Sequence, residues 1–155
     1  MQTFLPYPNF KDSAICLDNK RLNKQIIECY QILKALHGET KGWVNHPATL
    51  MWKGYENSLV CYGVWCCWVW KSRGFQTKLE EELVKFFNNS AIVFPWWVGL
   101  DKFHASHRSN LYRKDNNYYK KFQHEGNLPY CWPIEIDGRQ IFRYKHAGDK
   151  KYLPE

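Results

Sequence analysis

Three polar residues in the first amphipathic segment have types and a spacing that suit acid–base or electrostatic chemistry. Arg21, Gln25 and Glu28 follow one another at intervals of four and three positions, and Lys20 and Lys24 flank them. In a helix this spacing places the three side chains in one row beside the apolar stripe. A single carboxylate among cations can stay ionised near a phosphate backbone and stabilise a developing positive charge. An ordinary surface row of ion pairs has the same spacing, so the pattern leaves both interpretations open.

A second concentration of positive charge lies in residues 102–122, where six basic residues face one acid. The basic residues are Lys102, Arg108, Arg113, Lys114, Lys120 and Lys121. Cations bind phosphates without regard to sequence, and the interleaved Tyr118 and Tyr119 can stack on bases. A solvated helix whose tyrosines turn into the core is an equally good interpretation of the pattern alone.

The histidines give no metal signal. No pair has zinc-finger or HExxH spacing, so we expect neither a metal nor another cofactor. His104 and His107 are three residues apart and can share a helix face, although hydrogen-bonded structural histidines are more common than ligands. We keep His46, His104, His107 and Gln25 as candidates for the wall of a pocket.

Composition limits the class of protein. A chain of 155 residues with 45% hydrophobic content can bury one core, and 17% aromatic residues exceed what a small core usually needs. The net charge of +7 favours a polyanionic partner. The six cysteines form no CxxC, and the longest apolar stretch, residues 59–70, is too short to span a bilayer. We therefore expect a reduced, cytoplasmic protein with no membrane segment.

Helical periodicity is clearest near the N-terminus. Apolar residues recur at Leu22, Ile26, Cys29, Leu33 and Leu36. This stripe predicts a helix that begins after Asp18 and ends before Gly38. Residues 48–73 are apolar almost all round, which predicts one long, central, buried helix.

The second half of the chain shows shorter elements. A capping box at residues 77–80 predicts a third helix through Phe87, and residues 88–100 read as a loop. A fourth helical region covers residues 104–122, with a break near Asp115.

Alternating residues about Asp137-Gly138 predict a β-hairpin over residues 134–144. The predicted fold is mainly α: a compact helical bundle in a single domain, residues 1–155, with residues 127–148 as a hairpin extension.

Three segments taken in order resemble one family. They are LDNKRLNKQIIE (residues 17–28), HPATLMWKGY ending in KSRGF (residues 46–75), and FHAS followed by YYKKF (residues 103–122). This order resembles the phage-type pyrimidine-dimer DNA glycosylases, also called endonuclease V, and within them a bacterial and viral branch that opens with the same MQTFLPYP. The resemblance covers roughly residues 1–122, and the hairpin has no counterpart in the phage enzyme.

The resemblance implies a DNA glycosylase, with AP-lyase activity, that acts on damaged or modified pyrimidines in double-stranded DNA. In this family the N-terminal α-amine attacks the sugar C1′, and a carboxylate on the first helix assists. These roles fall on Met1 and Glu28. The run from Tyr118 to Phe122 matches the family's aromatic and basic tail, which contacts DNA. We expect a monomer.

The sequence departs from the family at three positions. Ile27 stands where the family has an arginine, and Arg21 where it has a histidine. Gln2 is too bulky for removal of the initiator residue, so we expect Met1 to be retained, with Lys20 or Lys24 as the nucleophile if its amine is blocked. The alternative is a non-catalytic double-stranded DNA-binding module that retains the fold. A metal-dependent nuclease would need clustered carboxylates, which the sequence does not show.

Overall fold

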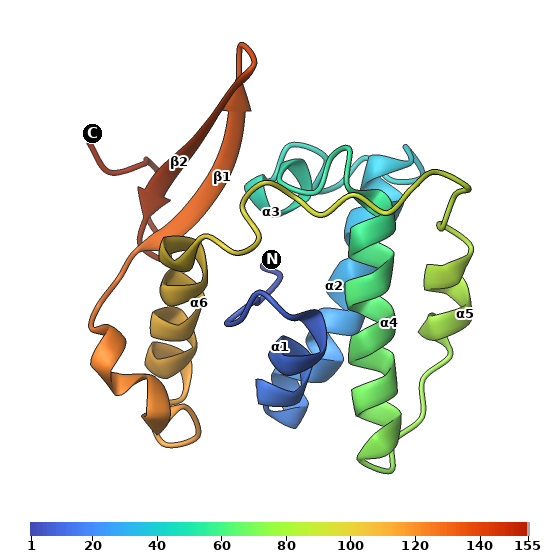
Figure 1. The fold of residues 1–155 in the computed structure, drawn as a ribbon, viewed down its shortest axis with the longest axis horizontal. Coiled ribbons are helices and arrows are strands. Elements are labelled where there is room, and N and C mark those ends of the chain that lie inside the picture. Colours follow the sequence, from blue (N-terminus) through green and yellow to red (C-terminus); the bar gives the residue numbers. More distant parts are fainter. Residues whose placement is uncertain (155) are drawn as a thin grey trace.

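The computed structural model describes residues 1–154, and the expected mainly helical fold with a C-terminal hairpin is confirmed (Figure 1). The elements in chain order are α1 (Phe10–Cys16), α2 (Asn19–Leu36), α3 (Pro47–Leu50), α4 (Glu56–Ser72), α5 (Leu79–Val84), α6 (Asp101–Lys114), the 3-10 helix η1 (Lys120–Glu125), β1 (Tyr130–Ile136) and β2 (Arg139–Lys145). No helix within the described residues is long and apolar enough to cross a membrane.

Helix α2 confirms the first periodic segment. Its apolar stripe is buried against α4, and Leu22, Ile26 and Cys29 are fully inaccessible to solvent. Gly38 follows with a φ of 73°, a left-handed conformation that glycine adopts without steric cost. The row of Arg21, Gln25 and Glu28 therefore lies on a well-packed helix.

The expected helix over residues 48–73 is wrong in one respect, because the chain forms two helices there. Gly54 has a φ of 87°, and the turn it makes separates α3 from α4. Met51 and Trp52 stay buried in that turn, so the apolar pattern runs on although the helix does not. An apolar pattern in the sequence indicates which residues are buried, and here the buried residues continue through the turn between the two helices.

Helix α5 is shorter than expected, ending at Val84 rather than Phe87. The Thr77 hydroxyl accepts a hydrogen bond from Leu79 N–H (3.2 Å), two residues on, whereas a capping box requires the N–H three residues on. The helix begins one residue later than the box predicts, with Lys78 at the N-cap. The Glu80 carboxylate completes no such box, since it pairs with Lys71 and accepts from the Trp68 indole. The ion pair between Glu80 and Lys71 of α4 therefore takes the place of a capping hydrogen bond at the start of α5.

The break at Asp115 and the hairpin are both confirmed. Helix α6 ends before Asp115, whose carboxylate accepts from Tyr118 N–H (2.9 Å). In the hairpin, Asp137 and Gly138 have φ values of 50° and 75°, as a two-residue turn of type I′ requires. The ladder extends back to Tyr130, so β1 begins four residues before the predicted start.

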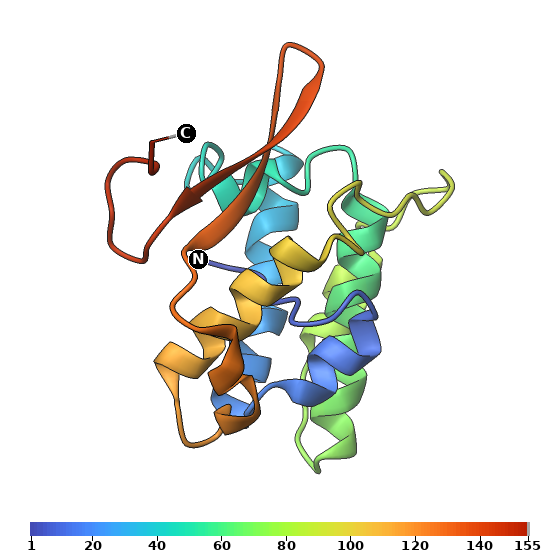
Figure 2. The same cartoon turned by 60° about the vertical axis from the view of Figure 1, so that its left-hand side comes forward.

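The N-terminal segment lies inside the structure. Figure 1 shows it running between α6 on one side and α2 and α4 on the other, and Figure 2 shows its start beside the base of the hairpin. Strand β1 packs on both α6 and α3. The sequence did not predict α1, a seven-residue helix in which Asn9 caps Asp12 N–H.

Candidate active site

A cavity of about 410 Å³ lies where the N-terminal segment, α2, the end of α6 and the hairpin meet. Among its lining residues are Met1, Gln2, Lys24, Glu28, Lys114 and Trp132. The cavity therefore joins the start of the chain to the polar row of α2, and its opposite wall comes from residues far along the sequence.

Glu28 lines this cavity and is almost completely buried, whereas the other carboxylate of the lining, Asp149, is exposed. The Oε2 of Glu28 accepts hydrogen bonds from the Gln2 backbone N–H (3.2 Å) and from Gln25 Nε2 (3.3 Å). Its Oε1 lies 3.9 Å from Lys24 Nζ. Burial raises the pKa of Glu28, while the hydrogen bond from Gln2 and the positive charges of the N-terminus and Lys24 oppose that shift. Folding has thus placed a costly buried carboxyl group beside the first residues of the chain.

Gln25 binds the N-terminal segment rather than standing free in the pocket. Its Oε1 accepts from Phe4 N–H (2.7 Å), and its Nε2 donates to the Gln2 carbonyl (2.9 Å). The Tyr62 hydroxyl donates to the Phe4 carbonyl (2.5 Å) and lies 3.0 Å from Gln25 Oε1. One buried amide therefore fixes the backbone that carries Met1 against α2, while also lining the cavity.

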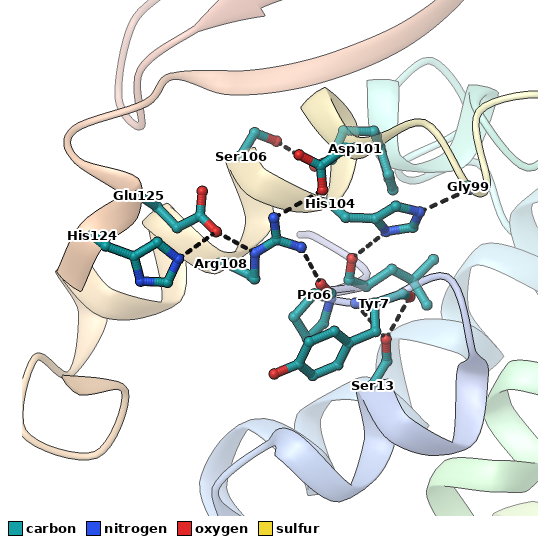
Figure 3. A network of polar contacts seen from close by, with 12 residues as sticks. Pro6, Tyr7, Ser13, Gly99, Asp101, His104, Ser106, Arg108, His124 and Glu125 are labelled. Carbon is teal, nitrogen blue, oxygen red and sulfur yellow. Dashed lines mark hydrogen bonds and ion pairs between the residues drawn. The ribbon is translucent and has the colours of Figure 1, made fainter. Parts of the chain in front are cut away.

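His104 and His107 lie behind the N-terminal segment and are absent from the residues that line the cavity. His107 Nδ1 accepts from Leu5 N–H (2.9 Å), so this ring is neutral, and burial lowers its pKa to about 3. His104 Nδ1 donates to the Leu5 carbonyl (2.8 Å), and its Nε2 accepts from Gly99 N–H (2.9 Å), as Figure 3 shows. Because the two histidines are three residues apart on α6, one ring binds the N–H of Leu5 and the other binds its carbonyl group.

His46 does line the cavity. Its Nδ1 accepts from Ala48 N–H (3.0 Å) and caps α3, which explains its place before a proline. Partial burial, followed by the positive charges of the N-terminus and Lys145, lowers the pKa of His46. A neutral imidazole therefore stands near the start of the chain.

Five cationic side chains line the cavity: Lys20, Arg21, Lys24, Lys114 and Lys145. Partial burial, together with the positive charges of Arg21 and Lys24, lowers the pKa of Lys114. Arg21 pairs with Asp18 (3.1 Å) and lies over the Tyr119 ring. Sequence reasoning did not select Lys145, whose place at the end of β2 follows only from the pairing of the hairpin.

Two arginines of the basic segment are engaged by internal partners. Arg108 bonds to Glu125 (2.5 Å), Asp101 (3.0 Å) and the Pro6 carbonyl (2.9 Å), as Figure 3 shows. Arg113 donates to Asn127 Oδ1 (2.8 Å) and to the Leu128 carbonyl (2.7 Å). Both side chains tie α6 to the segment that leads into the hairpin.

The two tyrosines of the basic segment have different environments. Tyr119 is fully buried, and its hydroxyl accepts from Asp18 N–H (2.9 Å) and donates to the Asp18 carboxylate. Tyr118 is 52% exposed, and Lys120 and Lys121 beside it are exposed too. Of the pair, Tyr118 is the one available to a ligand from outside.

Among residues 1–154, no group of three or more His, Cys, Asp or Glu side chains is arranged to hold a metal ion. The cavity offers the carboxylates of Glu28 and Asp149, the backbone and amine of the first residues, two histidines and several cations.

A family model described as "Pyrimidine dimer DNA glycosylase" matches residues 1–83, more than half of the chain. The chain belongs to that family. Membership places it among the DNA-repair glycosylases, enzymes whose substrate is DNA. No curated protein and no solved structure matches the chain significantly.

The match covers only one side of the cavity of this glycosylase. Met1, Glu28 and His46 fall within residues 1–83. The opposite wall, which includes Tyr130 and Trp132 of β1, falls outside. Sequence reasoning found the first side through the polar row of α2. The signals for the second side were the excess of aromatic residues and the basic segment that contains Lys114.

Proposed function

We propose that this protein excises pyrimidine dimers and then cleaves the strand as an AP lyase, with the α-amine of Met1 as nucleophile and Glu28 as the assisting carboxylate. One observation carries the proposal: Met1 and Glu28 line the same cavity, and Gln2 N–H donates to Glu28 Oε2. A nucleophile and a carboxylate joined through one residue of backbone have a fixed mutual position.

The reaction would proceed by displacement. The neutral amine forms a bond to the sugar C1′ while the C1′–N bond breaks, and the base leaves with the electron pair of that bond and takes up a proton. The sugar ring opens to an imine, and loss of the C2′ proton then expels the 3′ phosphate by β-elimination. An α-amine, as a class of nucleophile, suits such a displacement better than a lysine, which needs much stronger desolvation to lose its proton. The Glu28 carboxylate would stabilise the cationic sugar and carry protons.

We further propose that the cations around the cavity bind the phosphates of double-stranded DNA. Lys20, Arg21, Lys24 and Lys114 lie at the cavity itself. Tyr118, Lys120 and Lys121 are exposed as well, and Tyr118 and Lys121 line a separate hollow beside Cys16, where they would make a second contact with the DNA. Arg108 would support the surface from within, because its guanidinium group pairs with Asp101 and Glu125. Arg113 is exposed and binds only neutral oxygens of the protein, so its charge stays available to a phosphate.

Borohydride reduction tests the nucleophile, because it converts an imine between protein and DNA into a stable covalent bond. We expect the protein with a free N-terminus to be trapped on a duplex that carries a pyrimidine dimer or an abasic site. N-terminal acetylation, or an uncleaved extension, should abolish trapping while circular dichroism shows an unchanged fold.

Other outcomes would point elsewhere. Equal trapping by the extended protein would move the nucleophile to Lys20 or Lys24, which alanine substitutions would then separate. Binding without any trapping or excision would identify a DNA-binding module that has kept the fold and lost the chemistry.

A further inference from the structure

One face of the hairpin continues from the cavity to the tip. Residues directly opposite each other in an antiparallel pair share a face, and successive residues of a strand alternate between the two faces. Tyr130 and Trp132 of β1 and Lys145 of β2 line the cavity. By the register of the two strands, these residues share their face with Arg143 and Arg139, which lie further along β2. The outer part of this face is therefore an extension of the cavity wall.

Basic residues gather on the same face. It carries Arg139, Arg143 and Lys145, and we call it the cavity face of the hairpin. The acids of the two strands and their turn lie elsewhere, because Glu135 belongs to the opposite face and Asp137 to the turn. In the part of the chain that the structure describes, none of the three basic side chains forms an ion pair. Their charges are therefore available to an anion.

The opposite face is the one that attaches the hairpin to the loop before α6 and to α6 itself. Phe142, on that face, packs on Trp96 and Phe103, with ring centroids 4.8 Å and 6.5 Å away. Beyond this contact, residues 135–140 are all exposed, and Ile136 on the cavity face is 39% exposed. Figures 1 and 2 show the tip projecting past the helices. The outer half of the cavity face is therefore open to a large ligand.

The C-terminal segment orders two of the three cations. Arg143 and Lys145 both lie over the ring of Tyr152, at 5.7 Å and 5.3 Å from its centroid. Leu153 N–H donates to the Tyr144 carbonyl (2.6 Å), which fixes this segment along the edge of β2. An aromatic ring attracts a cation but does not neutralise its charge. The two cations are thus held in place before any ligand binds.

Duplex DNA fits the cavity face in shape and charge. The major groove, about 12 Å wide, admits a two-stranded β-ribbon, and phosphates accept cations whatever the base sequence. At about 3.3 Å per residue, β2 extends about 20 Å from Lys145 to Arg139. This length corresponds to about six base pairs of a duplex. A duplex whose sugar enters the cavity would therefore have its neighbouring base pairs within reach of the hairpin.

We propose that the cavity face of the hairpin binds one flank of the duplex, with Arg139 at the tip contacting a phosphate about six base pairs from the damaged base. The proposal rests on the proposed function for DNA as the ligand. It adds a contact surface that lies outside the family match, which ends at residue 83. The footprint of the protein on DNA is then longer on one side of the lesion than on the other.

The hairpin can be shortened without a change of register, which gives a direct test. Removing residues 135–136 and 139–140 leaves the two-residue turn between Ile134 and Ile141, which already pair with each other. The probe is a duplex with a tetrahydrofuran abasic analogue, which has no C1′ oxygen and therefore forms no imine. We expect hydroxyl-radical footprinting to show protection by the natural protein to about six base pairs on one side, and loss of its outer part with the shortened protein.

Affinity for asymmetric duplexes measures the same contact. Each duplex has about 12 base pairs on one side of the analogue and about three on the other, and the two duplexes differ in which side is long. On the duplex whose long arm lies under the hairpin, the shortened protein should bind about tenfold more weakly than the natural one. On the other duplex, the two proteins should bind within about twofold of each other.

Point variants guard against an indirect effect of the deletion. Arg139→Ala should weaken binding about threefold on the first duplex only. Gln140→Ala is the matched control, because Gln140 lies equally far out on the opposite face, and it should bind both duplexes as the natural protein does. Thermal melting checks that each variant is folded.

The outcomes separate this proposal from the proposed chemistry. Unchanged footprints and affinities for the shortened protein would overturn the hairpin contact, and so would an equal loss on both duplexes. Failure of borohydride trapping would refute the proposed nucleophile and leave these differences unaffected.

Discussion

Glu28 is proposed to assist the reaction as a carboxylate, although its burial in the folded protein disfavours the ionised form. Burial raises its pKa, which means that the folded protein binds the protonated form more tightly than the unfolded chain does. The stabilising effect of that proton is present at low pH and is lost as the pH rises above the ordinary range of a glutamate. At pH 7 the ionised carboxylate therefore costs stability.

Glu28→Gln should consequently raise the melting temperature at pH 7 by a few degrees, the shift that about 1 kcal/mol gives in a chain of this size. The amide oxygen can still accept from Gln2 N–H, and the charge is gone. The gain should vanish near pH 4, while base excision on a dimer duplex falls about 100-fold or more. Calorimetry at both pH values and a gel assay of excision are the measurements. Glu81→Gln, at an exposed position on α5, is the control, and a lower melting temperature for Glu28→Gln would contradict the argument.

Sequence reasoning at this scale succeeded where a residue type and a helical position coincided. Arg21, Gln25 and Glu28 were chosen for their row on α2, and all three line the cavity. Such reasoning could not place Trp132, because whether a tryptophan on a hairpin faces solvent, core or cavity depends on how the hairpin docks. It also could not separate Tyr118 from Tyr119, since the difference arises from a hydrogen bond between Tyr119 and Asp18, far back in the sequence.

Helix α6 acts on the cavity through the N-terminal segment that it holds. Its two histidines bind the backbone of Leu5 as neutral rings, and burial lowers the pKa of both, that of His107 to about 3. An unfolded histidine takes up a proton near pH 6.5. The stability that depends on the neutral ring is therefore complete above about pH 6.5 and declines as the pH falls toward 3.

His107→Asn should flatten this decline. Its Oδ1 can replace Nδ1 as acceptor for Leu5 N–H, and it does not titrate. Between pH 6 and pH 4, the free energy of unfolding of the natural protein should fall more steeply than that of the variant, by up to about 1.4 kcal/mol per pH unit. Urea unfolding across that range measures both slopes. Parallel curves would show that His107 is not the titrating group.

The elements themselves were predicted to different extents. Helix α2 and the hairpin followed from strong local signals, an apolar stripe with stops at both ends and an Asp-Gly turn. The joint between α3 and α4 did not, because the apolar pattern continues through a turn made by Gly54. Helix α1 was missed because its cap, Asn9, directly follows Pro6 and Pro8 in a short segment that reads as irregular.

The whole molecule has a net positive charge, and some of its basic side chains form ion pairs within the protein. Arg108 forms ion pairs with Asp101 and Glu125, whereas Lys24 and Lys114 line the cavity. Each phosphate that a cation neutralises adds about −0.9 to the slope of log affinity against log salt. The count of free cations near the cavity, rather than the net charge, should therefore set the salt dependence of DNA binding.

Lys24→Ala and Lys114→Ala should each weaken duplex binding and make that slope shallower by about 0.9. Fluorescence anisotropy at four or five salt concentrations gives both quantities. Lys85→Ala is the control, because Lys85 pairs with Glu82 on α5 and does not line the cavity. An unchanged slope in the two cavity variants would place the DNA on another face.

The anchoring of the N-terminal segment also has a consequence for the order of folding. The backbone of Phe4 is bound by α2 and α4, and that of Leu5 by His104 and His107. The N-terminal segment therefore lacks its full set of partners until residues beyond 100 have been synthesised. The α-amine of Met1 reaches its final position only when α6 docks on this segment. The proposed nucleophile is therefore not yet in place while the chain is being synthesised.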